Sequence, residues 1–412
     1  MRARWPCLAA LAALAVLAVA AAGCGGVSIS GASEAAGNQL AIYSSLPLQG
    51  PAAPIAQQIV NGERLALADA GGRVGRFGVG YVSLDDSNPT SGTLDPGVTA
   101  SNAKRAAADT STIAYLGEYS SAATAVSLPL INAAGILQVS PASPYVGLTS
   151  SLDAGQYEPQ RFYPSGRRTF GRLQPGDRGQ AEAQARLMRA LGVRSVYVLD
   201  DQNPFEIPLA QIVSADAQRS GIAVAGHDSL VVGVGTVFSG EIEKITRTGA
   251  QAVFFAGGPN PGAIALWRAL HSADPQLLLL GPSSMVSEEF TSAIGPAAAK
   301  TYLTTPFLDV GSYPPAATRM LSDYRRRFGG DPGPYALYGY EAMSVVLAAI
   351  RGAGLRGNDR QSVIERFFAI RNRASVLGSY SIQPDGETTL SRYGADRVRG
   401  GRPVFDRAID IG

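Results

Sequence analysis

Cysteine and histidine are nearly absent from this chain. Its 412 residues include two cysteines, Cys7 and Cys24, and two histidines, His227 and His271. Cys7 lies inside an apolar N-terminal run, so its removal would leave Cys24 alone, without a disulfide partner, a second metal-ligating thiol or a nucleophilic role. The histidines are far apart and show no ligand-like spacing. We expect no metal, no cofactor and no enzymatic activity, because hydrolysis needs a nucleophile with a base in reach.

An excess of charge of one sign is also lacking. The chain holds 35 Lys and Arg against 33 Asp and Glu, a net charge of +2, and loss of Arg2 and Arg4 would leave the two signs equal. Nucleic-acid binding needs a concentrated basic surface, so we expect no nucleic-acid partner. After the N-terminal run, no segment is long and apolar enough to span a bilayer. The remaining chain of about 390 residues predicts two domains.

The N-terminus has the pattern of an export signal. Arg2 and Arg4 precede an apolar run over residues 5–22, which closes with Ala-Ala-Gly before Cys24. This ending resembles a bacterial lipobox, whose thiol is diacylated, although Ala21 stands where a larger aliphatic residue is usual. We predict a signal peptide over 1–23, lipidation of Cys24, a tether over 24–37 and a position on the outer face of the cytoplasmic membrane. A plain signal peptide or an uncleaved anchor are the alternatives, and both place the rest of the chain outside.

Strands and helices are expected to alternate along most of the chain. Strands are predicted over 40–44, 77–84, 113–116, 136–139, 195–199, 223–227, 252–255 and 277–280. Helices are predicted over 54–70, 98–108, 121–134, 180–191, 209–220, 240–247, 263–271, 335–350 and 361–370. The final part is expected to form strands from 376–382 onward, with a turn at Pro384-Asp385-Gly386. Such alternation indicates parallel sheets, and the loop-like stretch over 150–177 divides it into two α/β lobes with a ligand cleft between them.

Seven segments resemble, in order, those of the branched-chain amino-acid (leucine/isoleucine/valine) binding protein family. They are SLPLQGPAAPIAQQIVNGERLALADAGG, YVSLDDSNP, YLGEYSSAATAVSLPLINAAGILQVSPASPYVGLT, VLDDQNPFE, FFAGGPNPGAIALWRAL, GPYALYGYEAMSVVLAAI and LGSYSIQPDGE. The resemblance covers about residues 41–406. It implies the type I periplasmic-binding-protein fold, with two Rossmann-like lobes and a three-segment hinge. The lobes would comprise 38–172 plus 283–375, and 173–282 plus 376–412.

The resemblance also implies where a ligand carboxylate binds. In the family a serine early in the helix after the third strand contacts the carboxylate, and Ser121 has that position, with Ser120 and Tyr119 beside it. The free N–H groups at a helix start and the helix dipole favour an anion there. Ser120 also fits the N-cap of this helix, a role that is compatible with ligand binding.

Other family positions would line the rest of the cleft. The backbone carbonyl of Ala142 matches one that contacts the ligand's amino group. A family threonine is replaced by Pro144, which offers neither hydroxyl nor N–H, and the neighbouring Ser143 is a substitute. Phe205 and Ile55 occupy positions that are usually aromatic in the family, and both keep the pocket apolar.

The acid that neutralises the ligand's ammonium in the family is missing from its usual segment. Here Gly258 is followed by Pro259, Asn260 and two further residues without a carboxylate, although Gly258 and Asn260 remain candidate contacts. A buried ammonium without a partner is costly. Either Glu118 or Glu206 supplies the charge, or the ligand lacks a cationic amine. Because Pro144 and the segment over 259–262 lack both family partners of the ammonium, we expect unmodified leucine, isoleucine and valine to bind poorly, and the alternative is that one of these glutamates supplies the charge.

The function that follows is capture of a small amino-acid-like or carboxylate-bearing solute for an ABC importer. The partners would be the solute, the permease subunits and, through the lipid anchor, the membrane. The alternative is a ligand sensor of the same fold that signals to a partner protein. The lipobox favours the importer, because a receptor ectodomain would need a membrane-spanning helix and a cytoplasmic module.

Overall fold

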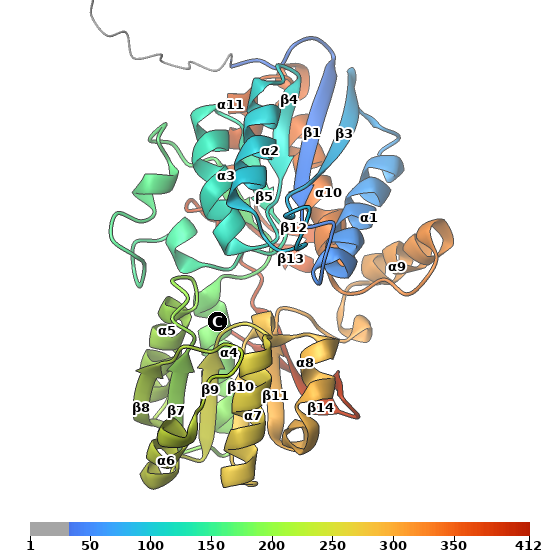
Figure 1. Cartoon of the computed structure of the whole chain (residues 1–412). Helices are drawn as coiled ribbons and strands as arrows, with labels where there is room; N and C mark the ends of the chain where they lie inside the picture. The colour runs from blue at the N-terminus through green and yellow to red at the C-terminus, as the bar shows by residue number, and fades with distance from the viewer. Residues whose placement is uncertain (1–32) are drawn as a thin grey trace, which may run out of the picture. The chain divides into compact units, whose positions relative to one another are not determined.

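The structure is a computed structural model, and it describes residues 33–412. These residues form two α/β lobes, each built on its own mainly parallel sheet (Figure 1). The predicted fold class is therefore confirmed. The expected signal peptide, Cys24 and the first part of the tether lie outside the described residues. Among the residues that are described, no helix is long and apolar enough to cross a membrane.

The first lobe contains a six-stranded sheet with the order β2-β3-β1-β4-β5-β6. Its strands are β1 (Gln39–Leu46), β2 (Arg73–Val74), β3 (Phe77–Asp85), β4 (Thr112–Leu116), β5 (Leu137–Ser140) and β6 (Phe170–Arg172). Its helices are α1 (Ala53–Asp69), α2 (Pro96–Ala108), α3 (Ser121–Ala133), α9 (Pro315–Phe328), α10 (Tyr335–Ala353) and α11 (Arg360–Phe368). A small hairpin of β12 (Arg373–Ser375) and β13 (Gly378–Tyr380) follows α11.

The second lobe contains a seven-stranded sheet with the order β15-β14-β11-β10-β9-β7-β8. Its strands are β7 (Ser195–Asp200), β8 (Ala223–Ser229), β9 (Ala252–Ala256), β10 (Leu278–Gly281), β11 (Thr301–Thr305), β14 (Arg392–Arg399) and β15 (Arg402–Asp410). Its helices are α4 (Asp177–Ala190), α5 (Ile207–Arg219), α6 (Ser239–Thr248), α7 (Pro261–Ala273) and α8 (Glu288–Ala293). Each strand and helix predicted before residue 281 is present, with ends displaced by a few residues.

Helices cover both faces of each sheet, because alternate side chains of a strand point to opposite faces. In β1, Leu40 and Ile42 pack in the core beneath α1, α9, α10 and α11. Ala41 and Tyr43 of the same strand pack beneath α2 and α3. The second sheet is covered in the same way, by α4 and α5 on one face and by α6, α7 and α8 on the other.

Two glycines allow α1 and α10 to approach closely. A Cβ at Gly62 would lie 2.2 Å from the carbonyl oxygen of Ala336, and a Cβ at Gly339 would lie 2.2 Å from that of Ile59. Any side chain at either position would force the helices apart. The predicted helical face with Gly62 therefore packs on the nearly all-apolar helix that was expected near residue 335.

The chain passes between the lobes after β6, after β11 and between β13 and β14. Two predicted boundaries are displaced from these crossings. The return to the first lobe was expected at 283, but β11 still pairs with β10 in the second sheet. The last crossing was expected at 376, but Val376 and Ile382 pack in the core of the first lobe. The turn at Pro384-Asp385-Gly386 is present, because Gly386 donates from its N–H to the Gln383 carbonyl and Ile382 bridges to Thr388.

The expected tether is shorter than predicted. Ala35 is buried and donates from its N–H to the Asn358 carbonyl at 2.7 Å, and Glu34 forms a β-bridge with Asp359. The N–H of Arg360 donates to the Ser33 carbonyl at 2.8 Å. Backbone hydrogen bonds therefore hold residues 33–35 against the start of α11, although this stretch is small and polar in sequence.

Candidate functional site

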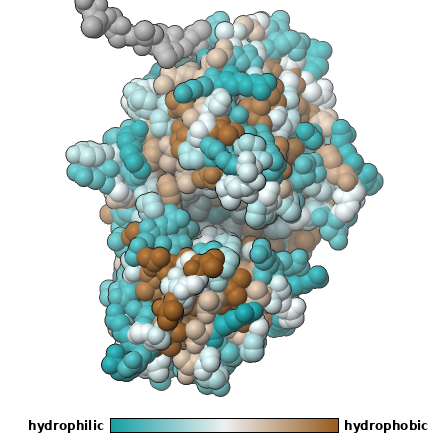
Figure 2. All heavy atoms as spheres, in the orientation of Figure 1, coloured by the Kyte–Doolittle hydropathy of each residue, from teal (hydrophilic) through white to brown (hydrophobic). Residues whose placement is uncertain are grey.

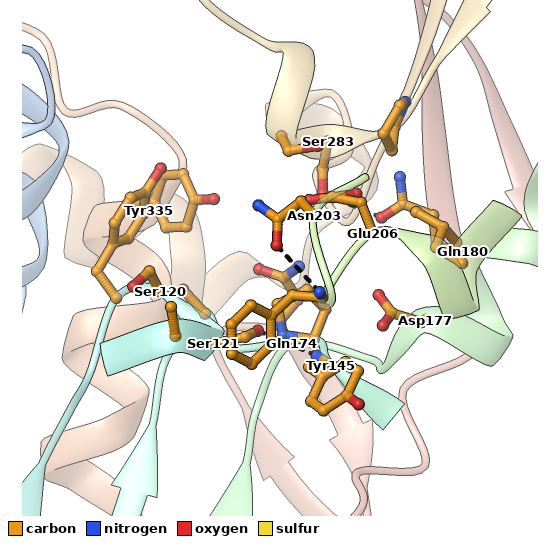
Figure 3. A pocket seen from close by; sticks show the side chains of 18 residues that line it. Ser120, Ser121, Tyr145, Gln174, Asp177, Gln180, Asn203, Glu206, Ser283 and Tyr335 are labelled. Atoms are coloured by element: carbon orange, nitrogen blue, oxygen red, sulfur yellow. Dashed lines mark hydrogen bonds between the residues drawn. The ribbon is translucent and has the colours of Figure 1, made fainter. Parts of the chain in front are cut away.

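A cavity of about 190 Å³ lies between the lobes, where strands of both sheets end. Figure 2 shows the molecular surface hollowed between the two lobes, and Figure 3 shows the residues that line the cavity. Both lobes and the first crossing contribute to its wall. The lining residues are Tyr119, Ser120, Ser121, Ala122, Ala142, Pro144, Tyr145, Gln174, Asp177, Gln180, Asn203, Phe205, Glu206, Leu209, Pro282, Ser283, Ser284 and Tyr335.

The N-terminus of α3 forms one side of the cavity. Ser120 is its N-cap, and the Ser120 hydroxyl accepts from the N–H of Ala123 at 3.2 Å. The N–H groups of Ser121 and Ala122 have no intrahelical acceptor in the first turn, and both residues line the cavity. The Ser121 hydroxyl accepts from the N–H of Tyr145 at 3.1 Å, which holds its oxygen in place. This arrangement of free amides and a fixed hydroxyl is suited to binding a carboxylate.

Two carboxyl groups, Asp177 and Glu206, lie on the other side of the hollow in Figure 3. Asp177 begins α4 and accepts from the N–H of Val146 at 3.2 Å. Burial raises the pKa of Asp177 to about 7, against the lowering effect of nearby Arg172. Burial, together with the charges of Asp177 and Asp201, raises the pKa of Glu206 well above its usual value. The empty cavity therefore disfavours two ionised carboxylates, and a cation between them would stabilise both.

Apolar side chains close the remaining wall. The rings of Tyr145 and Phe205 pack edge to face, with centroids 5.0 Å apart. Phe205 is positioned by its N–H, which donates to the Asn203 side chain at 3.0 Å (Figure 3). Leu209 of α5 lies beside them in the lining. These residues give the cavity a hydrophobic side.

Five of the nine expected ligand contacts line this cavity: Tyr119, Ser120, Ser121, Ala142 and Phe205. The other four do not. Ile55 lines a neighbouring cavity. Ser143 is fully buried, and its hydroxyl bonds to Thr124 and to the Glu118 carbonyl, so it is no substitute for the missing threonine.

Gly258 and Asn260 are absent from the cavity wall. The Asn260 side chain caps α7 by accepting from the N–H of Ala263 at 3.0 Å. The Gly258 N–H donates to the Asp201 carboxylate at 3.3 Å. Both residues have local hydrogen-bonding roles at the start of α7, and ligand contact by either one stays a prediction.

The two glutamates that could replace the missing acid differ in their position relative to the cavity. Glu118 is fully buried and accepts from the Tyr115 hydroxyl at 2.6 Å. It does not line the cavity, whereas Glu206 does. The segment over 259–262 lacks a carboxylate, as expected, but Glu206 and the unforeseen Asp177 bring two into the cleft. The two acids answer one of the two reasons for expecting leucine to bind poorly; the other reason, Pro144 in place of a threonine, remains in the cavity wall.

Several lining residues were not anticipated from the sequence. They are Gln174, Asp177, Gln180, Asn203, Ser283, Ser284 and Tyr335. Most follow a strand end or a crossing, which is where α/β folds place their ligand contacts. That rule could have found them once the strands were assigned. Among residues 33–412, no group of three or more His, Cys, Asp or Glu side chains could hold a metal ion.

Comparison with known proteins agrees with this geometry. A model of the periplasmic binding protein family matches residues 44–395. The Leu/Ile/Val-binding protein homolog 1 of Brucella suis is 27% identical over 351 residues, which cover 84% of this chain and 87% of the relative.

Two solved structures share the fold. A leucine-binding protein of Thermotoga maritima has a TM-score of 0.74 at 20% identity, covering 90% of this chain and 99% of that one. A solute-binding protein of R. palustris in complex with 4-hydroxybenzoate has a TM-score of 0.72 at 17% identity, covering 90% and 96%. The chain therefore belongs to the periplasmic binding protein family, whose members are extracytoplasmic, non-enzymatic solute-binding proteins.

Proposed function

We propose that this protein captures a small α-amino-acid-like solute in the cleft between its lobes and delivers it to an ABC importer. One observation carries the proposal: the start of α3, with Ser121, lies across the cavity from Asp177 and Glu206. A zwitterion has an anionic and a cationic group a few bonds apart. The carboxylate would accept from the free amides of α3, and the ammonium would lie beside the two acids.

The acids favour a ligand with an amine over a plain carboxylic acid. A buried carboxylate without a partner is costly. Arg172 is a buried cation near Asp177, but its guanidinium donates to the carbonyls of Ser143 and Tyr145 and to Glu387. An ammonium entering the cavity would therefore be the natural partner of Asp177 and Glu206. A purely anionic ligand would instead bind only while these carboxyls are protonated.

The ligands of structural neighbours are consistent with carboxylate capture. One neighbour is named a leucine-binding protein and another contains 4-hydroxybenzoate, and both ligands carry a carboxylate. The neighbours differ in whether the ligand has an amine. In the present chain the acidic side of the cavity supports the amine-bearing class.

Export, anchoring and partner proteins complete the proposal. The apolar N-terminal run and the Ala-Ala-Gly-Cys24 ending support lipidation of Cys24. A diacylated cysteine would hold the protein at the outer face of the cytoplasmic membrane. Closure of two lobes around a solute is a hinge motion about their connecting segments. The closed form would then be recognised by the permease subunits of the importer.

A thermal-shift screen of the purified protein tests the ligand class. The screen would contain α-amino acids, their amides, the matching 2-hydroxy acids, and aromatic acids. We expect stabilisation by amino acids with apolar side chains, because a ligand that binds only the native state raises its melting temperature. Stabilisation by 2-hydroxy or aromatic acids, with none by amino acids, would overturn the assignment of an amine-bearing solute.

A further inference from the structure

A second cavity adjoins the first and encloses about 410 Å³. Three residues, Tyr119, Ser283 and Tyr335, line both cavities. Tyr119 and Tyr335 pack edge to face with ring centroids 5.6 Å apart, at the boundary between the two spaces. A ligand anchored at Ser121 in the first cavity would reach the second by passing these rings.

The wall of the second cavity differs in chemistry from that of the first. It is formed mainly by aliphatic and aromatic side chains, among them Ile55, Val286, Phe307, Leu308, Tyr313 and Phe405. Phe307 packs edge to face on Tyr335 at 4.6 Å, so the aromatic boundary continues into this wall. Apolar surface of this kind favours an apolar group that leaves water. The first cavity, in contrast, is lined by serines, amides and two acids.

A polar atom in this wall has no partner within the protein. The Gln58 side-chain oxygen is buried and accepts no hydrogen bond from any described residue, and Gln58 lines the second cavity. Buried polar atoms are almost always hydrogen-bonded, so an unpaired one requires an explanation. An apolar group has no donor to offer, so this oxygen marks a polar point on a wall that is otherwise mainly apolar. Asp396, on the same wall, has its pKa raised to about 6 by burial.

We propose that the second cavity binds the tail of the solute, so that this protein selects α-amino acids whose apolar side chain is longer than that of leucine. This inference rests on the proposed function, because the polar end of the ligand is assigned to the first cavity. The volume favours a long tail, because the second cavity, at about 410 Å³, is about twice as large as the first, at about 190 Å³. Leucine would leave most of that space unfilled.

Calorimetric titration with a graded series tests the inference. The series is L-alanine, norvaline, norleucine, 2-aminooctanoate and homophenylalanine. Each methylene moved from water into an apolar site contributes about 0.8 kcal/mol, which converts to about fourfold in affinity. We expect affinity to rise by two- to fourfold per methylene up to 2-aminooctanoate, and homophenylalanine to bind more tightly than norvaline.

Blocking variants identify which space holds the tail. Ile55→Trp fills part of the second cavity and should cost the two longest ligands more than tenfold in affinity while changing norvaline binding less than twofold. Val310→Trp, on the same wall but 47% exposed, provides the same readout if Ile55→Trp does not fold. Val234→Trp is the matched control, because Val234 is 87% exposed and lines neither cavity. It should leave the whole series unchanged.

The outcomes separate the two proposals. Affinity that is greatest at norvaline and falls for longer members would overturn the tail assignment alone. Equal loss for all members in both blocking variants would also overturn it, since the tail would then not be in the second cavity. Failure of every member, alanine and norvaline included, to bind the unaltered protein would overturn the proposed function itself.

Discussion

Arg172 and Glu387 form an ion pair that joins two of the three crossings between the lobes. Arg172 ends β6, and its Nε donates to the Glu387 carboxylate at 3.0 Å. The N–H of Arg172 also donates to the carbonyl of Gly386 at 3.0 Å. Gly386 has a φ of 97°, and a Cβ there would lie 2.2 Å from the carbonyl oxygen of Phe170. The Pro-Asp-Gly turn thus brings Glu387 to Arg172 at the hinge.

Glu387→Gln should lower the free energy of unfolding by about 3 kcal/mol, the lower end of the range for breaking a buried ion pair. Arg172 is fully buried, and the substitution leaves its charge uncompensated. Burial alone would raise the pKa of Glu387, but the Arg172 guanidinium holds this pKa below its usual value. The stabilisation of the fold by the Glu387 carboxylate is therefore present above the usual glutamate pKa, and it is lost as the pH falls through the lowered pKa of the folded protein. Chemical denaturation of both proteins measures the difference.

The control for this prediction is Glu182→Gln. Glu182 pairs with Arg186 on the exposed face of α4, four residues along the same helix. Such surface pairs contribute about 0.3–0.5 kcal/mol. An equally small loss from Glu387→Gln would contradict the structural role assigned to the hinge pair.

Ser121→Ala should weaken binding of a carboxylate-bearing ligand by about 1.5–3 kcal/mol, the range for a hydrogen bond to a charged group. The substitution also removes the acceptor of the Tyr145 N–H, so the segment that faces α3 loses its anchor. Calorimetry gives the change in affinity, and denaturation checks that the fold is retained. Ser214→Ala is the control, because that hydroxyl bonds only locally to the Ala210 carbonyl within α5. Unchanged affinity in Ser121→Ala would place the carboxylate elsewhere.

Amino-acid binding should strengthen as pH rises from about 5 to 8. Burial raises the pKa of Asp177 to about 7, so the empty protein holds a proton near neutrality that an incoming ammonium must displace. Without a ligand, the fold favours the protonated form of this carboxyl, whereas a bound ammonium favours the ionised form. Binding therefore releases a proton and strengthens as the pH rises. Stability of the empty protein should correspondingly fall as pH rises through 7. Titrations in buffers of different ionisation enthalpy detect the released proton.

Glu206→Gln tests the same acid pair directly. It should weaken amino-acid binding by about 1.5–3 kcal/mol, the range for a hydrogen bond to a charged group, and leave the matching 2-hydroxy acid nearly unaffected. Glu243→Gln, on the exposed surface of α6, is the matched control for loss of one negative charge. A pH-independent affinity, or equal losses for both ligands in Glu206→Gln, would contradict the role of these acids.

Cys24→Ala should release the protein from the membrane fraction or leave it unprocessed. Two acyl chains on one residue give stable anchoring, and the substitution removes the thiol that carries them. Fractionation of cells that produce either form measures the effect. The same distribution for both forms would exclude lipidation at Cys24.

The sequence predicts most strands of both sheets but misses β11, which lies between β10 and β14. Strands such as β9 are continuous apolar runs that are buried on both faces, which is a strong signal. β14 and β15 carry charged residues throughout, and β11 reads Thr-Tyr-Leu-Thr-Thr, so none of the three shows such a run. β15 is an edge strand, and edges tolerate charge because water can hydrate them. The missed strand β11 displaced the predicted crossing at 283.

The site was predictable on one side of the cleft only. Ser120 and Ser121 follow from the resemblance and from the physics of a helix start, because they lie within one short segment. Asp177 and Glu206 begin different helices of the second lobe, and their approach to α3 depends on how the two lobes face each other. No local periodicity encodes that relationship. The acid that the family places beyond Gly258 is absent here, and its candidate replacement, Glu206, comes from another part of the chain.

The most direct test of the account is calorimetric titration of the purified protein with L-leucine, L-leucinamide and 2-hydroxy-4-methylpentanoate at pH 8. The three share one side chain, and the last two each lack one of the charged groups assigned to Ser121 and to the Asp177–Glu206 pair. We predict micromolar or tighter binding of leucine, and at least about tenfold weaker binding of the other two, as expected for loss of a charged hydrogen bond. Binding of the hydroxy acid as tightly as leucine, or no binding of leucine, would contradict the account.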